Sequence, residues 1–290
     1  MKQELEVSEK LEHPHVVKVL DLCEDEDDIY IALELIKHGN LLEVLSKMER
    51  KKIPITEKHA ADIIYQILLA INYIHASNIV HRDLKLENIM VDVVAGENGE
   101  ANLICKVTDF GFACMMDPKK KINLSLGSPI YMAPEVIKQR FYNSKVDIWS
   151  LGVIAYIILT GKAPFDGRRR EDIFASICQD TLKIFPLKKY ANQGELVIDF
   201  FGRCFERDPK KRWSAAMLLD HPWLTIMAKR EEVAEDVFVE TALNIYTFKQ
   251  SSLFQSSVIA FLVGLKSAKE DLTVLSKVFK QLDVSKDGYL

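Results

Sequence analysis

The pattern of hydrophobic and polar residues predicts two strands near the start of the chain. Residues 29–35, with the sequence IYIALEL, alternate between isoleucine or leucine on one face and tyrosine, alanine or glutamate on the other. Residues 16–23 also have the composition of a strand, and the acidic run at residues 25–28 suits a turn between the two. We therefore expect a β-hairpin here, with Leu33 and Leu35 on its apolar face.

A helical period replaces this alternation after Asn40. Thr56 is a suitable N-cap for a helix that runs to about Ala76, because its hydroxyl can accept a hydrogen bond from the first turn. Six large aliphatic side chains in this segment fall on one stripe, as expected of a helix with one buried face. They are Ile63, Ile64, Ile67, Leu68, Ile71 and Ile74.

Strand-like runs return at residues 89–93 and 103–107, on either side of the turn-rich sequence GENGE at residues 96–100. From Val146 onward the chain reads mostly helical, and a compact unit ends near residues 221–223. The predicted fold class is therefore α+β, with a small strand-bearing front and a large helical body.

Composition and charge limit the class of protein. The formal net charge is −4, with 48% hydrophobic and 28% charged residues, so nothing suggests nucleic acid as a partner. Five scattered cysteines without a C-x-x-C spacing favour a reducing compartment over a disulfide framework or a zinc site. The N-terminal sequence lacks the apolar core of a signal peptide, and the most apolar stretch, residues 151–159, is shorter than the roughly 20 residues of a membrane span. We expect a cytoplasmic protein without a transmembrane segment.

Three short strings in the middle of the chain carry the candidate chemistry. They are HRDLKLEN at residues 81–88, DFG at residues 109–111 and APE at residues 133–135. Phosphoryl transfer to an alcohol needs a carboxylate to receive the proton, a cation to neutralise charge on the moving group, and oxygen ligands for magnesium. Each string alone is a weak signal, but together, in this order, they supply all of these groups.

The three strings resemble those of eukaryotic protein kinases, and the resemblance implies a role for each matching residue. Asp83 would be the catalytic base, and Lys85 would contact the γ-phosphoryl group of ATP. Asn88 and Asp109 would hold Mg²⁺. Lys85 and the run GSP at residues 127–129 resemble a serine/threonine enzyme, so the expected substrates are ATP and protein serine or threonine side chains.

The same resemblance places the nucleotide beside the second predicted strand. Leu33 would be the gatekeeper, with the Glu34 carbonyl and the Ile36 amide facing adenine. Met90 would lie beneath the base, and Glu87 is grouped with these nucleotide-binding residues. For Leu33, Ile36 and Met90, ordinary packing in a hydrophobic core is an equally good interpretation.

A further set of residues is expected to support the site. Asp147 would steady the backbone of the catalytic loop, and Glu135 would pair with Arg212. Glu4 resembles the glutamate that partners a strand lysine in the family. The full set is Glu4, His81, Arg82, Phe110, Gly111, Ser128, Glu135, Asp147 and Arg212.

The sequence contains neither the glycine-rich loop nor the strand lysine with which a kinase domain begins. We expect from this that it is a fragment of a longer kinase, and the alternative is a truncated pseudokinase or scaffold. The expected division is a small-lobe remnant at residues 1–39, a catalytic lobe at 40–224, a junction region at 225–270 and the start of an EF-hand at 271–290.

The last residues resemble the opening of an EF-hand calcium loop. Asp283, Ser285 and Asp287 fit ligand positions 1, 3 and 5, and the Tyr289 carbonyl fits position 7. Behind a kinase body, this partial loop makes the chain resemble the calcium-dependent protein kinases of plants and protists, which implies Ca²⁺ as a regulator of the full-length form. Two other interpretations stay open: a non-catalytic docking module, and a calcium sensor with a vestigial kinase body.

Overall fold

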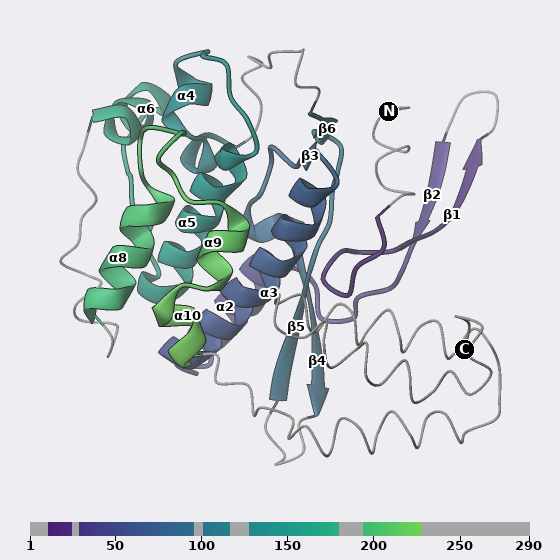
Figure 1. Cartoon of the computed structure of the whole chain (residues 1–290). Coiled ribbons are helices and arrows are strands. Elements are labelled where there is room, and N and C mark those ends of the chain that lie inside the picture. The colour runs from purple at the N-terminus through teal and green to yellow at the C-terminus, as the bar shows by residue number, and fades with distance from the viewer. Residues whose placement is uncertain (1–10, 25–28, 96–100, 117–127, 180–193, 228–290) are drawn as a thin grey trace, which may run out of the picture. The chain divides into compact units, whose positions relative to one another are not determined.

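The computed structural model describes residues 11–24, 29–95, 101–116, 128–179 and 194–227 (Figure 1). Several predictions fall outside these ranges: Glu4, the turns at 25–28 and 96–100, the junction region from residue 228 to 270, and the calcium-loop residues Asp283, Ser285, Asp287 and Tyr289. Within the described part of the chain, no helix combines the length and the apolar character that crossing a membrane requires.

The two strands predicted near the start of the chain form an antiparallel hairpin. They are β1 (Val19–Glu24) and β2 (Ile29–Leu33). The prediction that the first strand starts at residue 16 was wrong, because this segment pairs elsewhere before β1 begins. The N–H of Val17 donates to the carbonyl of Val107 (2.9 Å), and Val16 forms an isolated parallel bridge with the same residue.

The apolar face predicted for β2 is largely uncovered by the described residues. Ile31 is 40% exposed, Leu33 is 47% exposed, and Leu35, just past the strand, is 81% exposed. The alternating pattern therefore predicted the strand correctly, but the described part of the chain does not cover that face.

Two helices follow the hairpin, and both begin at side-chain caps. In α2 (Leu41–Arg50) the side chain of Asn40 accepts from the N–H of Glu43 (3.0 Å). In α3 (Glu57–Ala76) the hydroxyl of Thr56 accepts from the N–H of His59 (3.2 Å), so the predicted bounds are confirmed. The six aliphatic residues of the predicted stripe are all buried.

A second antiparallel hairpin, β4 (Ile89–Ala95) and β5 (Ala101–Val107), packs against α3. Gln66 of α3 joins the two elements, since its side chain donates to the carbonyl of Leu103 (2.9 Å) and accepts from the N–H of Cys105 (2.8 Å). The predicted strands are confirmed, and each extends further toward the turn than expected. A short pair, β3 (Ile79–Val80) with β6 (Cys114–Met115), lies on either side of this hairpin in the chain.

The described chain from Val146 onward is mostly helical, as predicted, and short helical turns also lie before it. These helical elements are the 3₁₀ turns η1 (Leu86–Asn88) and η2 (Pro129–Tyr131) and the helices α4 (Pro134–Ile137), α5 (Lys145–Thr160), α6 (Arg170–Gln179), α8 (Gly194–Cys204), α9 (Ala215–Leu219) and α10 (Pro222–Met227).

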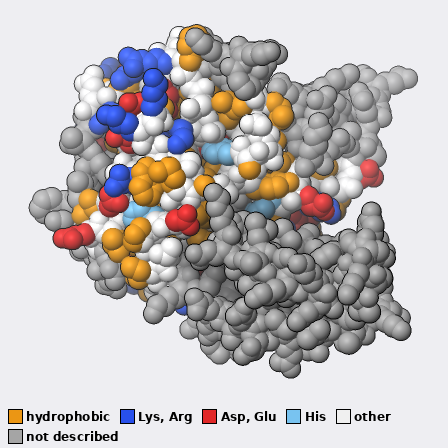
Figure 2. Space-filling view, viewed as in Figure 1, with side chains coloured by type: hydrophobic (Ala, Val, Ile, Leu, Met, Phe, Trp, Pro, Cys, Tyr) orange, Lys and Arg blue, Asp and Glu red, His pale blue; other side chains and the backbone are white. Residues whose placement is uncertain are grey.

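Lys and Arg side chains gather over the end of this helical body that carries α4 and α6 (Figure 2).

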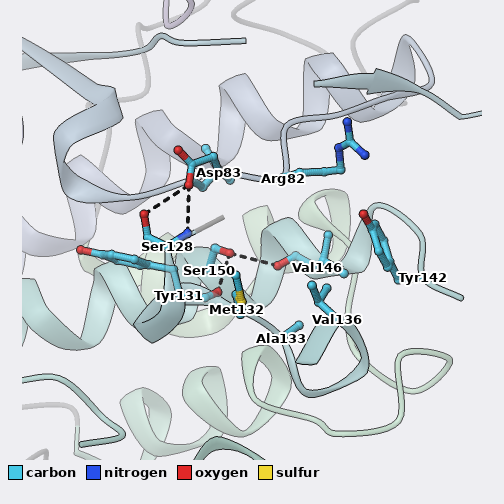
Figure 3. Close-up of a pocket in the computed structure, with 11 residues that line it drawn as sticks. Arg82, Asp83, Ser128, Tyr131, Met132, Ala133, Val136, Tyr142, Val146 and Ser150 are labelled. Carbon is cyan, nitrogen blue, oxygen red and sulfur yellow. Dashed lines mark hydrogen bonds between the residues drawn. The ribbon is translucent and has the colours of Figure 1, made fainter. Parts of the chain in front are cut away.

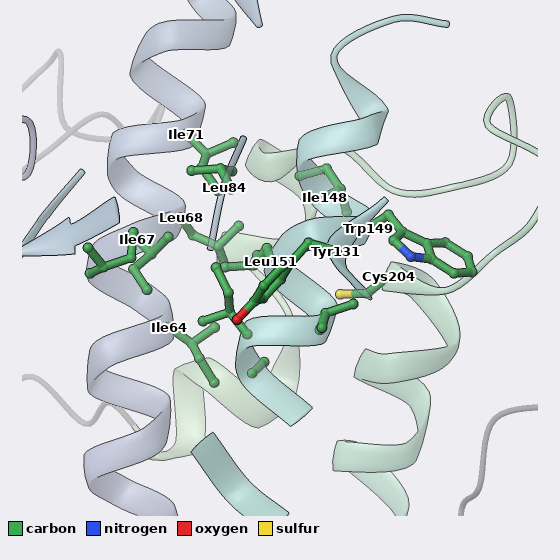
Figure 4. Packing of buried hydrophobic residues seen from close by; sticks show 14 of the residues in the cluster. Ile64, Ile67, Leu68, Ile71, Leu84, Tyr131, Ile148, Trp149, Leu151 and Cys204 are labelled. Atoms are coloured by element: carbon green, nitrogen blue, oxygen red, sulfur yellow. The ribbon is translucent and has the colours of Figure 1, made fainter. Parts of the chain in front are cut away.

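The core of the helical body lies between α3 and α5 (Figure 4). Helix α5 is apolar on nearly all sides, as expected of a helix that is surrounded by protein. Trp149 of α5 stacks on Phe165, with ring centroids 5.5 Å apart, and meets the edge of Phe205 at 5.1 Å. All three tryptophans of the chain, Trp149, Trp213 and Trp223, belong to this body.

Candidate active site

The residues predicted to react come together in the loop between β3 and β4. Asp83 is 4% exposed, and its Oδ2 accepts from Lys85 Nζ at 2.6 Å. The 3₁₀ turn η1 brings Asn88 back to the same carboxylate, where Nδ2 donates to Oδ2 at 3.3 Å and to the Asp83 carbonyl at 2.9 Å. One carboxylate, one ammonium group and one amide therefore converge on the same point.

Ser128 holds the other oxygen of the Asp83 carboxylate. Its N–H donates to Oδ1 at 3.1 Å and its hydroxyl at 3.3 Å (Figure 3). A cavity of about 10 Å³ lies beside this contact, walled by residues such as Tyr131, Met132 and Tyr142. Because this volume holds at most one water, the support of Asp83 is closely packed.

Asp147 on α5 steadies the backbone of the catalytic loop in the way the sequence predicted. Its Oδ2 accepts from the N–H of His81 (2.9 Å) and its Oδ1 from the N–H of Arg82 (2.9 Å). Arg82 has a φ of 69°, a left-handed conformation that costs free energy for a residue with a side chain. The two hydrogen bonds offset that cost.

A third partner of Asp147, His75 at the end of α3, was missed by the sequence interpretation. His75 Nε2 lies 2.8 Å from Asp147 Oδ2. Burial alone would raise the pKa of Asp147, but the hydrogen bond and charge of His75, with the contacts from His81, outweigh it and lower the pKa. Asp147 is therefore a carboxylate at neutral pH and can hold the loop. The hydrophobic pattern of α3 does not distinguish His75 from its neighbours, so the sequence contained no indication that it would contact Asp147.

The buried ring of His81 connects this loop to the segment before Asp109. Its Nδ1 accepts from the N–H of Asp83 (3.3 Å), so Nε2 carries the proton and donates to the carbonyl of Thr108 (3.0 Å). Burial lowers the pKa of His81, despite the opposing charge of Asp147, and keeps the ring neutral. Phe110 packs on the ring, with centroids 5.1 Å apart.

Asp109 and Asn88 form a donor set that fits a magnesium ion. The N–H of Thr108 donates to the carbonyl of Asn88 (3.0 Å), which joins the two segments. The Asn88 amide nitrogen faces Asp83, so its Oδ1 is the atom left for a cation, and Asp109 adds an exposed carboxylate. Hard oxygen ligands of this kind suit Mg²⁺. The N–H of Gly111 donates to Asp109 Oδ1 (3.3 Å) and orients the carboxylate.

Charge around Lys85 keeps its side chain protonated. Burial would lower the pKa of Lys85, but the hydrogen bond to Asp83 and the charges of Asp83, Asp109 and Glu87 together raise it. The exposed Glu87 is thus part of the electrostatic environment of the site.

Two of the predicted nucleotide-contacting residues, Glu34 and Met90, lie next to a lysine that the sequence interpretation missed. Lys106 Nζ lies 2.7 Å from both carboxylate oxygens of Glu34, and in the β4–β5 register Lys106 is opposite Met90. Leu33 is half exposed, while Ile36 and Met90 are partly buried and lie outside the hydrophobic core. These three side chains are therefore not part of the hydrophobic core of the described residues.

The ion pair predicted between Glu135 and Arg212 is present and buried. Arg212 Nη1 lies 2.7 Å from Glu135 Oε1, and Nη2 lies 3.0 Å from Oε2. The guanidinium also donates to the carbonyl of Lys145 (2.9 Å) and lies over the ring of Trp149. Such a fully bonded bidentate pair anchors the segment that follows Ser128 to the helical body.

Comparison with known proteins agrees with these motifs. The family model of the protein kinase domain matches residues 1–224. Calcium-dependent protein kinase 4 of Plasmodium berghei is 30% identical, with 99% of this chain and 53% of the relative aligned. CDPK-related kinase 7 of Arabidopsis thaliana is 34% identical, over 96% and 46%. Serine/threonine-protein kinase 33 of Bos taurus is 37% identical, over 78% and 46%. The chain spans about half the length of these curated relatives.

Proposed function

This chain belongs to the protein kinase family, and we propose that it transfers the γ-phosphoryl group of ATP to serine or threonine hydroxyls of other proteins. The observation that carries the proposal is the convergence of Lys85, Asn88 and Ser128 on the carboxylate of Asp83. A scaffold has no need to position a carboxylate between a cation and a candidate metal ligand.

Each side chain then has one task in the transfer. Asp83 accepts the proton of the attacking hydroxyl, and it is held in place by Ser128 on one oxygen and by Lys85 on the other. Lys85 stays charged and offsets the negative charge of the transferred group. Asn88 Oδ1 and the Asp109 carboxylate would hold Mg²⁺, which neutralises phosphate charge when it is bound.

The test replaces Asp83 by asparagine and measures phosphate transfer from Mg-ATP to a library of serine- and threonine-containing peptides. We expect kcat to fall by about 10²–10⁴-fold, since the variant lacks a general base. Asp220→Asn, at the end of α9, is the matched carboxylate-to-amide control and should leave kcat unchanged. Undiminished turnover by Asp83→Asn, or no detectable transfer by the unsubstituted chain, would contradict the proposal.

We further propose that calcium controls this activity through Asp283, Ser285, Asp287 and the Tyr289 carbonyl. Support comes from a relative named as a calcium-dependent protein kinase, which aligns with nearly the whole chain, and from ligand spacing in the sequence. A cytoplasmic location belongs to the same proposal, and the free thiols of Cys105, Cys114, Cys178 and Cys204 agree with a reducing compartment.

Removing the metal tests the calcium proposal. Phosphate transfer should fall when a calcium chelator replaces calcium at constant Mg²⁺, because the regulatory loop is then empty. In the Asp283→Ala variant, the rate of phosphate transfer with calcium should equal the rate with the chelator. A chelator effect of the same size in both proteins would mean that calcium acts somewhere else.

A further inference from the structure

A groove separate from the active site opens where the chain leaves β2 and enters α2. It has a volume of about 460 Å³, in the range of ligand-binding pockets. Its wall includes residues 37–39, one side of α2 and Val93 of β4. Successive strand residues point to opposite faces, so Val93 and Met90 face different sides of β4. The groove is therefore distinct from the position expected for adenine.

The rim of this groove is basic. Lys37, Lys47 and Lys51 line it, all three are exposed, and within the described part of the chain none of them forms an ion pair. Lys47 and Lys51 are one helical turn apart, so their side chains leave α2 on the same side. Three ammonium groups at one opening favour an anionic occupant.

The two acidic side chains near the groove, Glu43 and Asp92, each accept a side-chain hydrogen bond. Glu43 accepts a hydrogen bond from the side chain of Asn40 (3.1 Å) and lies against Gly39, whose φ of 86° and lack of a side chain allow this approach. Asp92 is held by His38 Nδ1 at 2.8 Å. The hydrogen bonds from His38 and from the backbone N–H of Val93, followed by the charges of His38 and Lys37, lower the pKa of Asp92. An amide donor leaves the charge of Glu43 in place, so the groove lining carries three lysines against one carboxylate.

An apolar surface also lines the groove. Val44 and Met48 of α2, together with Ile53 and Val93, supply this surface, and Ile53 is 49% exposed. An inorganic anion would use the lysines but leave this surface in water. An occupant that matches both parts carries carboxylates and aliphatic side chains together.

We propose that this lysine groove, defined by Lys37, Lys47, Lys51 and the apolar residues that line it with them, docks an acidic peptide segment of protein substrates. Aliphatic side chains of the segment enter the groove, and its aspartate and glutamate side chains meet the lysines. The assignment to substrates rests on the proposed kinase function, whereas the binding itself does not. Gly39 joins the groove to β4, because the N–H of Val91 donates to its carbonyl (2.9 Å), so a docked segment is held next to the nucleotide site.

Isothermal titration calorimetry of the full chain with a synthetic peptide of alternating leucine and glutamate tests the proposal. We expect the double variant Lys47→Glu, Lys51→Glu to bind at least roughly tenfold more weakly, because two attractive charges become repulsive. The matched control, Lys210→Glu with Lys211→Glu, makes the same change in net charge at exposed positions outside the groove and should bind normally. Circular dichroism checks that each variant is folded.

A second peptide, with serine in place of leucine, separates docking from general charge attraction. It should bind at least roughly tenfold more weakly than the first, since the apolar surface of the groove then has no partner. No binding by the unsubstituted chain, equal loss in both double variants, or equal affinity for both peptides would overturn the proposal. Because calorimetry needs no phosphate transfer, an inactive chain that binds would refute the kinase function alone.

Discussion

Two hairpins of this protein share the same secondary structure and differ in what covers them. In β4–β5, Ile89, Val91 and Val107 are completely buried against the helical body. In β1–β2, Ile31 and Leu33 are almost half exposed. A two-stranded hairpin alone is marginally stable in water. We therefore expect packing on α3, rather than strand pairing alone, to stabilise β4–β5.

Few contacts attach β1–β2 to the rest of the described chain. The backbone of Val107 bonds to His15 and Val17, just before β1 begins. On the far side of β2, Glu34 pairs with Lys106, and its carboxylate also accepts from the N–H of Lys18 (2.8 Å). These contacts are polar and partly exposed, so we expect this hairpin to open well before the helical body unfolds.

The ion pairs of the two regions should differ most in their effect on stability. We expect Glu135→Ala to lower the free energy of unfolding by about 3–5 kcal/mol, because it leaves the buried guanidinium of Arg212 without its counter-charge. Glu12→Ala removes the pair with Lys18 ahead of β1, whose side chains are 82% and 56% exposed, and should cost less than about 1 kcal/mol. Urea denaturation followed by circular dichroism measures both. Similar losses of unfolding free energy in the two variants would contradict the expected difference between the buried and the exposed ion pair.

An isoleucine pair makes the same comparison within the hairpins themselves. Ile89→Ala in β4 should lower the free energy of unfolding by about 2–5 kcal/mol, because it leaves a cavity in the hydrophobic core. Ile31→Ala in β2 should change it by no more than about 0.5 kcal/mol. The same denaturation experiment applies. A large loss with Ile31→Ala would mean that something covers this face in solution.

A pH dependence is expected at His13, where the chain approaches the first hairpin. Burial, followed by the charges of His15 and Lys106, lowers the pKa of His13 from 6.5 to about 4. Between these pH values the unfolded chain binds a proton that the folded protein does not, so stability is lost as pH falls. His13→Asn should reduce the slope of unfolding free energy against pH in that window. An unchanged slope would contradict the assignment.

Local signals in the sequence were enough to predict most of the fold. The caps and bounds of α3 follow from Thr56 and the aliphatic stripe, and both hairpins follow from alternation and turn residues. The residues that surround Asp83 were predictable because their order in the chain is a motif. The family resemblance also anticipated the pairing of Glu135 with Arg212 across the helical body.

Contacts between distant side chains without a motif were not predictable. His75 meets Asp147 and Lys106 meets Glu34 across long stretches of chain, and neither contact leaves a periodic trace. The exposure of Leu33 was missed for a related reason. Alternation indicates which face of a strand is apolar, but it contains no information on what covers that face.

The position of the three tryptophans has a practical consequence for anyone who follows this protein by its intrinsic fluorescence. Trp149, Trp213 and Trp223 all lie in the helical body, and the buried indole N–H of Trp149 has no hydrogen-bond acceptor among the described residues. Emission from such a ring should be blue-shifted and should move to longer wavelength only when the helices separate. Because β1 and β2 contain no tryptophan, opening of that hairpin leaves the spectrum unchanged. A single sharp fluorescence transition would therefore describe the helical body alone.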